Sequence, residues 1–303
     1  MNQNFYDKLN NVIAKDSILL DEPMSRHTTF RVGGPADFFV TPKAKEEVRD
    51  VIRICKEAGM PYYIIGNGSN LLVSDAGYRG VIVQIYKEMN EVKVEGDLVK
   101  AQAGALLSGI AAKALGAELS GFEFASGIPG TIGGACVMNA GAYGGEIKDV
   151  LIDATVLTAE GELKTVTRDE LDLSYRHSIV PEKGYIVLSA RFRLTPKPKD
   201  EIKSYMAELR TKRVEKQPLE YPSAGSTFKR PEGYFAGKLI MDAGLRGYSV
   251  GDAQVSQKHC GFVVNKGEAT AADVLTLIKD VQETVLKQFG VKLEPEVKMI
   301  GEF

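Results

Sequence analysis

The feature that most constrains the fold of this chain is a concentration of glycine between residues 121 and 145. This segment, GFEFASGIPGTIGGACVMNAGAYGG, holds eight of the 31 glycines. Glycine at such a density weakens helices and strands, because it loses more conformational freedom on folding than any other residue. It is typical of places where the backbone approaches another group closely. The segment therefore indicates a ligand-binding surface made of main chain, with a strained structural crossover as the alternative.

A second glycine-rich loop, Gly66-Asn-Gly-Ser-Asn70, lies between two short apolar runs that we predict to be strands. Its small residues and backbone N–H groups suit a diphosphate, although a plain tight turn would have the same composition. It is not a Rossmann fingerprint, because Leu71 stands where that motif needs a further glycine. Two phosphate-compatible loops on a mixed scaffold indicate a long ligand with a central diphosphate, such as a dinucleotide.

Hydrophobic periodicity distributes helices and strands around these two segments. It predicts helices over 41–59 and 105–115, a third from about residue 200, and a fourth after a Thr270–Asp273 capping box. Strands are predicted over 62–65, 71–73, 81–85, 92–95, 98–103, 154–158, 163–167 and 186–194. The pattern indicates an α+β protein, and the sequence at 195–198, Thr-Pro-Lys-Pro, is typical of a linker.

Composition narrows the possible functions. The 303 residues allow about two domains, and a net charge of −2 with both signs interspersed disfavours nucleic acid as a partner. No apolar run approaches the roughly 20 residues that span a bilayer, and Met1–Asp16 does not resemble a signal peptide. We therefore expect a cytoplasmic protein without membrane insertion. The three cysteines and three histidines lack metal-ligand spacing, so we expect no metal site.

Three short segments carry reactive side chains outside the glycine-rich loops. Arg176 lies in Tyr-Arg-His-Ser, Ser226 in the small-residue turn Ala-Gly-Ser-Thr-Phe, and Glu296 directly after a proline near the C-terminus. Each has an ordinary structural explanation, which is a surface ion pair, a capping hydroxyl and a solvated carboxylate, respectively. We interpret the adjacent His259 and Cys260 as a hydrogen-bonded imidazole beside a buried thiol.

Taken together, these motifs resemble the UDP-N-acetylenolpyruvoylglucosamine reductase (MurB) family of bacterial peptidoglycan synthesis, over nearly the whole chain. The matching segments are 26–36 (RHTTFRVGGPA), 66–70, 127–134, 139–144, 174–176, 225–229 and 293–297. The first loops alone would indicate only the wider flavoprotein fold shared with vanillyl-alcohol oxidases. The last three motifs are much more specific.

The resemblance implies an α+β, FAD-binding vanillyl-alcohol-oxidase-like (PCMH-type) fold with a smaller C-terminal α+β substrate domain. We expect FAD-binding subdomains at 1–88 and 89–197 and a substrate-binding domain at 198–303. FAD would be held noncovalently. The residues expected around it are Gly66, Asn67, Gly68, Ser69, Asn70, Leu71, Gly127, Ile128, Pro129, Gly130, Gly133, Gly134, Asn139 and Gly141.

The resemblance also implies a ping-pong reduction of UDP-N-acetylglucosamine enolpyruvate to UDP-N-acetylmuramate, with NADPH as co-substrate. By the family's pattern, hydride passes through N5 of the flavin to the vinyl carbon and Ser226 protonates the adjacent carbon. Arg176 and Glu296 would steady the enolate-like carboxylate between the two transfers. The residues expected to bind the diphosphate and sugar of the substrate are Tyr175, Arg213, Lys216 and Lys229.

Side-chain chemistry independently suits two of these roles. Hydride addition pushes negative charge toward the substrate carboxylate, and a fixed guanidinium such as that of Arg176 stabilises this charge. A serine hydroxyl in a dry turn, such as that of Ser226, is a weak acid that can deliver one proton. A bare carboxylate would repel the substrate, so the role of Glu296 follows from the resemblance alone.

Some alternatives stay open at this point. The segment 231–239 is too short for the tyrosine-bearing loop of longer family members, so the chain resembles the shorter subtype, with Tyr234 as a candidate replacement and Arg230 where some members have asparagine. A flavin oxidase of the same fold would hold FAD through a histidine or a cysteine, and Cys136 lies just beyond the glycines. A non-catalytic nucleotide-sugar-binding flavoprotein is the other alternative. No dinucleotide fingerprint separates NADPH from NADH.

Overall fold

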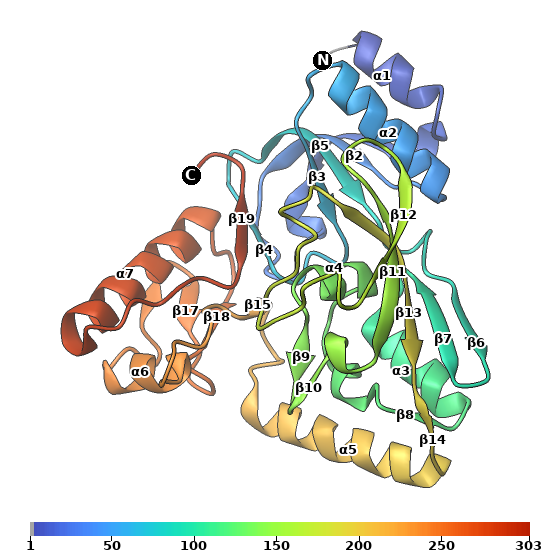
Figure 1. The fold of residues 1–303 in the computed structure, drawn as a ribbon. Coiled ribbons are helices and arrows are strands. Elements are labelled where there is room, and N and C mark those ends of the chain that lie inside the picture. Colours follow the sequence, from blue (N-terminus) through green and yellow to red (C-terminus); the bar gives the residue numbers. More distant parts are fainter. Residues whose placement is uncertain (1–2) are drawn as a thin grey trace. The chain divides into compact units, whose positions relative to one another are not determined.

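The computed structural model describes residues 3–303, which fold into two compact units with separate hydrophobic cores (Figure 1). The first unit runs to Leu20 and includes 38–67 and 80–212, and the second comprises 21–37, 68–79 and 213–303. Helices combined with mostly antiparallel sheets confirm the predicted α+β class. The domain boundaries expected after residues 88 and 197 stay predictions.

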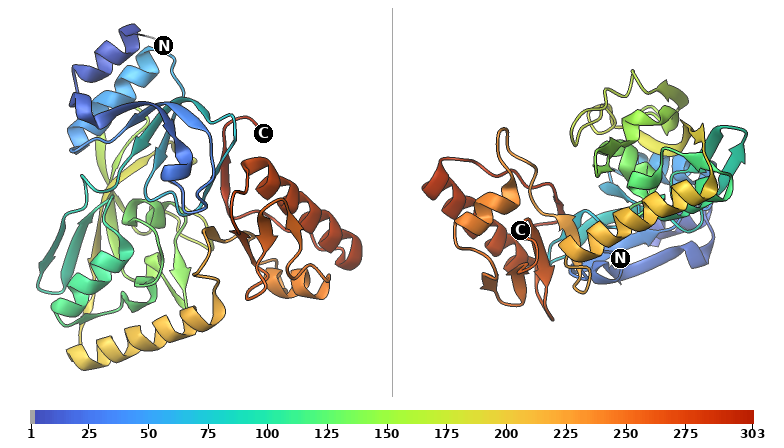
Figure 2. Two further views of the ribbon diagram at one scale, coloured as in Figure 1. Left: turned by 180° about the vertical axis from the view of Figure 1, so that it is seen from behind. Right: turned by 90° about the horizontal axis from the view of Figure 1, so that it is seen from below.

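A four-stranded sheet in the order β1-β2-β5-β3 carries the two N-terminal helices on one face (Figures 1 and 2). Helix α2 buries an apolar stripe that includes Val48, Val51 and Cys55, as the spacing predicts. The helix starts at Lys45, later than expected, because the backbone of Ala44 is extended and Ala44 takes the N-cap position. The elements here are α1 (Gln3–Asn10), β1 (Ile18–Pro23), β2 (Pro35–Val40), α2 (Lys45–Glu57), β3 (Tyr62–Ile65) and β5 (Tyr78–Gln84).

A five-stranded antiparallel sheet in the order β12-β11-β13-β7-β6 forms the other half of the first unit. Its strands are β6 (Val92–Glu95), β7 (Leu98–Gln102), β11 (Leu151–Leu157), β12 (Leu163–Thr167) and β13 (Ile186–Arg193). The predicted hairpin between β6 and β7 is confirmed, with Gly96 at φ 61° in its turn. Helices α3 (Leu107–Gly116) and α4 (Ile132–Val137) belong to the same core.

The segment expected to be a linker is partly a strand, so that prediction is wrong. Strand β14 (Thr195–Pro196) pairs with β8 (Leu119–Ser120), with Thr195 opposite Ser120 and Pro196 opposite Leu119. Helix α5 (Lys199–Lys216) follows at once and buries only Ile202 and Leu209. The remaining short elements are β9 (Gly141–Ala142), β10 (Gly145–Glu146) and 3-10 turns at 15–17, 24–26, 123–125 and 147–149.

The second unit has its own four-stranded sheet, in the order β15-β18-β17-β16, with helices α6 and α7. The predicted capping box is present, since Thr270 and Asp273 bond each other's backbone N–H at the start of α7. The elements are β4 (Leu71–Val73), β15 (Ser223–Ser226), α6 (Ala236–Asp242), β16 (Ser249–Val250), β17 (Ala253–Val255), β18 (Phe262–Asn265), α7 (Ala271–Phe289) and β19 (Lys298–Ile300). Strand β19 pairs in parallel with β4, so the C-terminal segment lies beside the residues that follow the Gly66–Asn70 loop. Within residues 3–303, no helix has the length and apolar character needed to span a membrane.

Candidate active site

The two glycine-rich segments meet at one pocket in the first unit. Gly66 contributes from the loop after β3, and Gly133 and Gly134 contribute from α4. The pocket has a volume of about 90 Å³ and is otherwise lined by Ile64, Ile65, Ile85, Ala103, Thr131, Val137, Tyr185, Ile186 and Val187. Backbone and small polar groups therefore face apolar walls, an arrangement that suits a ligand with a polar linker and a flat apolar part.

The absence of side chains lets the two backbones approach each other. A Cβ atom on Gly66 would lie 2.2 Å from Thr131 Oγ1, and one on Gly133 would lie 2.9 Å from the Cβ of Ala103. Asn67 Nδ2 also donates a 2.7 Å hydrogen bond to the carbonyl oxygen of Pro129. The contacts of Gly66 and Asn67 bring together the two loops that the sequence predicts to share a ligand, whereas the contact of Gly133 packs α4 on the residue that follows β7.

Gly134 differs from these two glycines because the protein leaves room for a side chain there. It is exposed, it lies inside a helix, and a Cβ atom on it would have Thr131 Oγ1 as its nearest neighbour, at 3.7 Å. Packing within the protein does not require a glycine at this position, whereas a helix disfavours it. Gly134 lines the pocket, and the absence of a side chain there would let a ligand approach the backbone closely.

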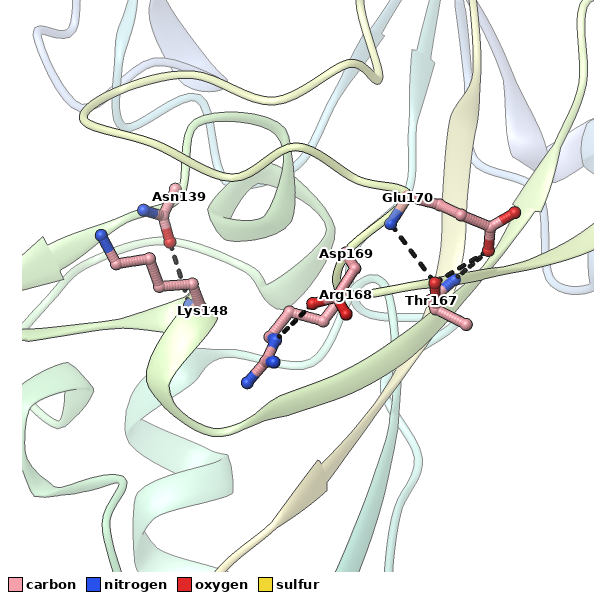
Figure 3. Close-up of polar contacts among 6 residues, drawn as sticks. All are labelled: Asn139, Lys148, Thr167, Arg168, Asp169 and Glu170. Atoms are coloured by element: carbon pink, nitrogen blue, oxygen red, sulfur yellow. Dashed lines mark hydrogen bonds and ion pairs between the residues drawn. The ribbon is translucent and has the colours of Figure 1, made fainter.

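Asn139 is fully buried and joins the glycine-rich segment to the turn that holds Arg176. Its Nδ2 donates to Glu146 Oε2 and to the carbonyl oxygen of Ser174, each at 3.0 Å, and its Oδ1 accepts from the N–H of Lys148 at 3.0 Å (Figure 3). Because these bonds occupy the side-chain amide, its predicted cofactor contact would be made by the main chain.

The turn at 174–177 follows a short connection from β12. That connection starts with reciprocal hydrogen bonds, since Thr167 donates to Glu170 Oε2 from both its N–H and its hydroxyl, and the N–H of Glu170 donates to Thr167 Oγ1 (Figure 3). At the other end, Ser178 Oγ donates to the carbonyl oxygen of Val137 at 2.6 Å. The turn is therefore anchored both to the sheet and to the end of α4.

Arg176 is half-buried in this turn, with its guanidinium 5.1 Å from the Tyr175 ring centroid and Nη2 3.4 Å from the carbonyl oxygen of Gly141. Its backbone is left-handed at φ 53°, as are those of Asn139 (45°) and Tyr143 (54°). Such conformations cost free energy in residues other than glycine and are concentrated at functional sites. Three such residues on segments joined by the bonds of Asn139 and Arg176 make this cluster a candidate functional site.

Glu146 is the acidic member of the same cluster. A hydrogen bond from Lys148 is the main cause that holds the pKa of Glu146 below its ordinary value, and the Arg176 charge adds a smaller contribution in the same direction. Glu146 therefore stays ionised, and its carboxylate offsets part of the positive charge around Arg176.

In the second unit, buried Thr227 joins the segments of Ser226 and Glu296. Its N–H donates to the carbonyl oxygen of Gly261 at 2.8 Å, its hydroxyl oxygen accepts from Val263 at 2.9 Å, and its carbonyl oxygen accepts from the N–H of Glu296 at 2.8 Å. The two predicted catalytic residues of this unit therefore lie on adjacent chain segments. The sequence analysis missed Thr227, although its place directly after Ser226 was a usable signal.

Glu296 also contacts the end of the predicted diphosphate loop. Asn70 Nδ2 donates to the carbonyl oxygen of Glu296 at 3.1 Å, and the N–H of Lys298 donates to the carbonyl oxygen of Asn70 at 3.0 Å. Ser226 and Glu296 are both half-buried. Residues from three distant parts of the sequence thus meet within the second unit.

The predicted substrate-binding cations differ in their surroundings. Lys229 lies beside this cluster, where its N–H donates to the carbonyl oxygen of Glu294 and its Nζ is 3.2 Å from Glu294 Oε2. Arg213 and Lys216 lie in the last turn of α5, where Arg213 Nε donates to Gln217 Oε1 and Lys216 is exposed. Solvent-accessible ion pairs such as that of Lys229 with Glu294 contribute little to stability, so Lys229 can turn to a ligand at small cost.

The imidazole of His259 packs edge-on against Phe262, and its Nδ1 accepts the N–H of Gly261 at 3.1 Å. Cys260 beside it is a buried free thiol, in agreement with the interpretation of this pair as structural. Burial lowers the pKa of His259 below its ordinary value of 6.5. The ring is therefore neutral near pH 7. Its Nδ1 accepts a hydrogen bond from Gly261, whose carbonyl oxygen in turn accepts the N–H of Thr227.

We expect the fold to lose stability as the pH falls below about 6.5, because unfolded His259 binds a proton that folded His259 resists. The unfolded state takes up more protons in this window, so acidification favours unfolding. Urea denaturation near pH 7 and near pH 5.5 measures the effect, and His259→Gln should weaken the pH dependence. An unchanged pH dependence in His259→Gln would contradict this assignment.

Comparison with known proteins identifies the family. Residues 36–167 match the FAD binding domain family, and residues 217–300 match the C-terminal domain of UDP-N-acetylenolpyruvoylglucosamine reductase. A protein of Agathobacter rectalis named UDP-N-acetylenolpyruvoylglucosamine reductase is 72% identical, with 100% of both chains covered. The chain belongs to the UDP-N-acetylenolpyruvoylglucosamine reductase family. A relative of the same name from Lachnoclostridium phytofermentans is 55% identical over 100% of this chain and 99% of its own.

Solved structures agree with membership of the reductase family. The crystal structure of UDP-N-acetylenolpyruvylglucosamine reductase (MurB) from Thermus caldophilus has a TM-score of 0.80 and 38% identity, covering 93% of this chain and 97% of that one. A 4-ethylphenol oxidase from Gulosibacter chungangensis has a TM-score of 0.51 at 15% identity, covering 97% of this chain and 64% of that one, which shows a shared fold alone. The predicted vanillyl-alcohol-oxidase-like FAD-binding fold is confirmed.

Proposed function

We propose that this protein is the FAD-dependent, NADPH-oxidising reductase that converts UDP-N-acetylglucosamine enolpyruvate to UDP-N-acetylmuramate in peptidoglycan synthesis. The observation that carries the proposal is 72% identity, over the full length of both chains, to a protein named for this reduction. The matching FAD-binding segment at 36–167 supports FAD as the cofactor, and we propose that it is held noncovalently. We also propose subdomains at 1–88 and 89–197 and a substrate domain at 198–303.

The lining of the pocket in the first unit supports this pocket as the place of part of the cofactor. Gly66 lets its loop pack closely on Thr131, Gly133 lets α4 pack closely on Ala103, and Gly134 leaves space that a methyl group would fill. Apolar walls such as Ile64 and Val187 suit a flat ring system. The residues that we propose to hold FAD are those predicted from the sequence, with Gly66, Gly133 and Gly134 supported by their place in the pocket.

Replacing Gly134 with alanine tests this assignment. The substitution should stabilise the cofactor-free protein by about 0.5–1 kcal/mol, because alanine favours a helix and the site has room for it. It should weaken FAD binding by about 5- to 100-fold, because the methyl group occupies ligand space. Fluorescence titration of the cofactor-free protein with FAD measures the affinity. Unchanged affinity would remove Gly134 from the FAD site.

The main charge-stabilising role belongs to Arg176. FAD, when bound, supplies the two-electron chemistry that links NADPH oxidation to reduction of the enolpyruvyl double bond. Arg176 binds the substrate carboxylate and stabilises the negative charge that develops on it. Its anchored turn and left-handed backbone fix the guanidinium before the substrate arrives, which is the condition for preferential stabilisation of the transition state.

Ser226 donates the proton to the carbon next to the carboxylate. Gly225, at φ 76°, lets the chain turn directly before it, and Thr227 fixes the chain directly after it. Glu296 lies on the adjacent segment, and its backbone is held by Thr227 and Asn70. We assign Glu296 to steadying the enolate-like intermediate together with Arg176. Tyr175, Arg213, Lys216 and Lys229 are proposed to bind the diphosphate and sugar.

One observation speaks against the flavin-oxidase alternative in its covalent form. Cys136, the cysteine within the glycine-rich segment 121–145, is fully buried in α4, and burial raises the pKa of its thiol to about 12. Its thiolate form, which would have to attack the flavin, is therefore scarce near neutral pH.

Product analysis tests the proposed function. The full-length holoenzyme should oxidise more than one equivalent of NADPH only when the enolpyruvyl sugar is added, and mass spectrometry should find a product that has gained two hydrogen atoms. Parallel assays with NADH give the cofactor preference. Binding of the sugar without NADPH oxidation would support the non-catalytic alternative instead.

A further inference from the structure

One buried hydroxyl stands out among the side chains of residues 3–303. Thr29 Oγ1 is shielded from solvent and has no hydrogen-bond partner, and it is the only such side-chain atom in this part of the chain. Buried polar groups in native proteins are nearly always paired, because losing water without gaining a partner costs stability. An exception of this kind points to a partner from outside the protein.

The neighbouring residue, Thr28, has a hydroxyl whose hydrogen-bond partners lie within the protein. Thr28 Oγ1 donates to the carbonyl oxygen of Val32 at 2.8 Å and accepts the N–H of Val32 at 3.3 Å. Thr28 is also buried. Thr29 as a residue is half-buried, and its hydroxyl, unlike that of Thr28, has no partner within the protein.

Thr29 lies against the loop that is predicted to hold a diphosphate. Its N–H donates to the carbonyl oxygen of Gly68 at 3.2 Å. Gly68 packs so closely on this segment that a Cβ atom there would lie 1.9 Å from the carbonyl oxygen of His27, and its φ of 62° also favours glycine. The loop and Thr29 are thus held together by main-chain contacts.

We propose that Thr29 Oγ1 is a ligand-binding hydroxyl that donates a hydrogen bond to a diphosphate oxygen of FAD. The proposal rests on the proposed function, which supplies the cofactor. The loop 66–70 contains no lysine or arginine, so a diphosphate there depends on neutral donors. A hydrogen bond from a hydroxyl to a charged oxygen belongs to one of the stronger classes. It would give Thr29 Oγ1 the partner that it lacks in the cofactor-free protein.

Thr29→Val, Thr29→Ser and Thr28→Val, each in the full-length chain, test this inference. After FAD has been removed, Thr29→Val should unfold at the same temperature as the wild type or higher, because it loses no internal bond. Its dissociation constant for FAD should rise by about 10- to 100-fold, the usual effect of losing a hydrogen bond to a charged group. Thr29→Ser should bind FAD nearly as the wild type does.

Thr28→Val is the matched control, and it should show the reverse pattern, with a lower unfolding temperature when free of FAD and a smaller change in FAD affinity. Titration with UDP-N-acetylglucosamine tests whether Thr29 binds the diphosphate of FAD or that of the sugar nucleotide. Thr29→Val should leave the affinity for UDP-N-acetylglucosamine unchanged. Unchanged FAD affinity in Thr29→Val, a lowered unfolding temperature in that variant, or weakening of the sugar nucleotide alone would overturn the inference. A wild-type chain that failed to bind FAD would instead overturn the proposed function.

Discussion

Replacing Ser226 with alanine should slow reduction of the enolpyruvyl sugar by about 10²- to 10⁴-fold, the usual contribution of a general acid. NADPH-driven bleaching of the flavin should keep its wild-type rate, because no proton is delivered to the sugar in that half-reaction. Anaerobic stopped-flow absorbance measures the two half-reactions separately. The fold should survive, since the bonds that hold this turn are made by Thr227 and Gly261.

Ser223 provides a matched control for this variant, because it lies on the same strand, β15, three residues before Ser226. Ser223→Ala should leave both half-reactions near their wild-type rates. Equal losses in the two half-reactions of Ser226→Ala would mean that this serine shapes the flavin site and is not the proton donor.

Arg176→Lys should lower the rate of the same half-reaction by about 10²- to 10³-fold, the typical effect of removing one donor that stabilises transition-state charge. Lysine keeps the positive charge but lacks the planar fork of donors that matches a carboxylate. The loss should be mainly in kcat, since the guanidinium acts most strongly on charge that develops during the reaction. Steady-state kinetics with varied sugar concentration separates kcat from KM.

Arg168→Lys is the control for this substitution. Arg168 lies on the connection that leads to the same turn, is exposed, and donates through Nε to its neighbour Asp169 (Figure 3). Its replacement should leave the kinetics near wild type. A KM increase without a change in kcat in Arg176→Lys would assign Arg176 to ground-state binding alone.

Strongly patterned elements were predictable from the sequence. Strands 62–65, 71–73 and 163–167 occur at the predicted residues, and the Thr270–Asp273 capping box starts α7 as expected. Each of these has a local physical cause, either β-branched apolar runs or reciprocal side-chain bonds. The linker prediction at 195–198 failed because proline content reports only local stiffness, whereas the pairing of β14 with β8 depends on a strand more than 70 residues earlier.

The segments that form the candidate site could be predicted from the sequence, but the contacts between those segments could not. Glycine density indicated that the segments 66–70 and 127–134 share a ligand, and both line or adjoin one pocket. The bonding of Thr227 to Glu296, and of Asn70 to the same residue, joins positions that are far apart in the sequence. No local pattern encodes such contacts, since they arise only when β15 and the C-terminal segment pack in the same unit. The unpaired hydroxyl of Thr29 is likewise visible only in three dimensions.

The most direct test of the proposed reaction is an anaerobic titration of the purified full-length protein, followed by visible absorbance. The protein should be yellow, lose its colour with one equivalent of NADPH, and regain it with one equivalent of UDP-N-acetylglucosamine enolpyruvate. Acid denaturation should release the flavin as free FAD. Rapid recovery of colour with oxygen, together with no response to the enolpyruvyl sugar, would contradict the proposed function and establish a flavin oxidase.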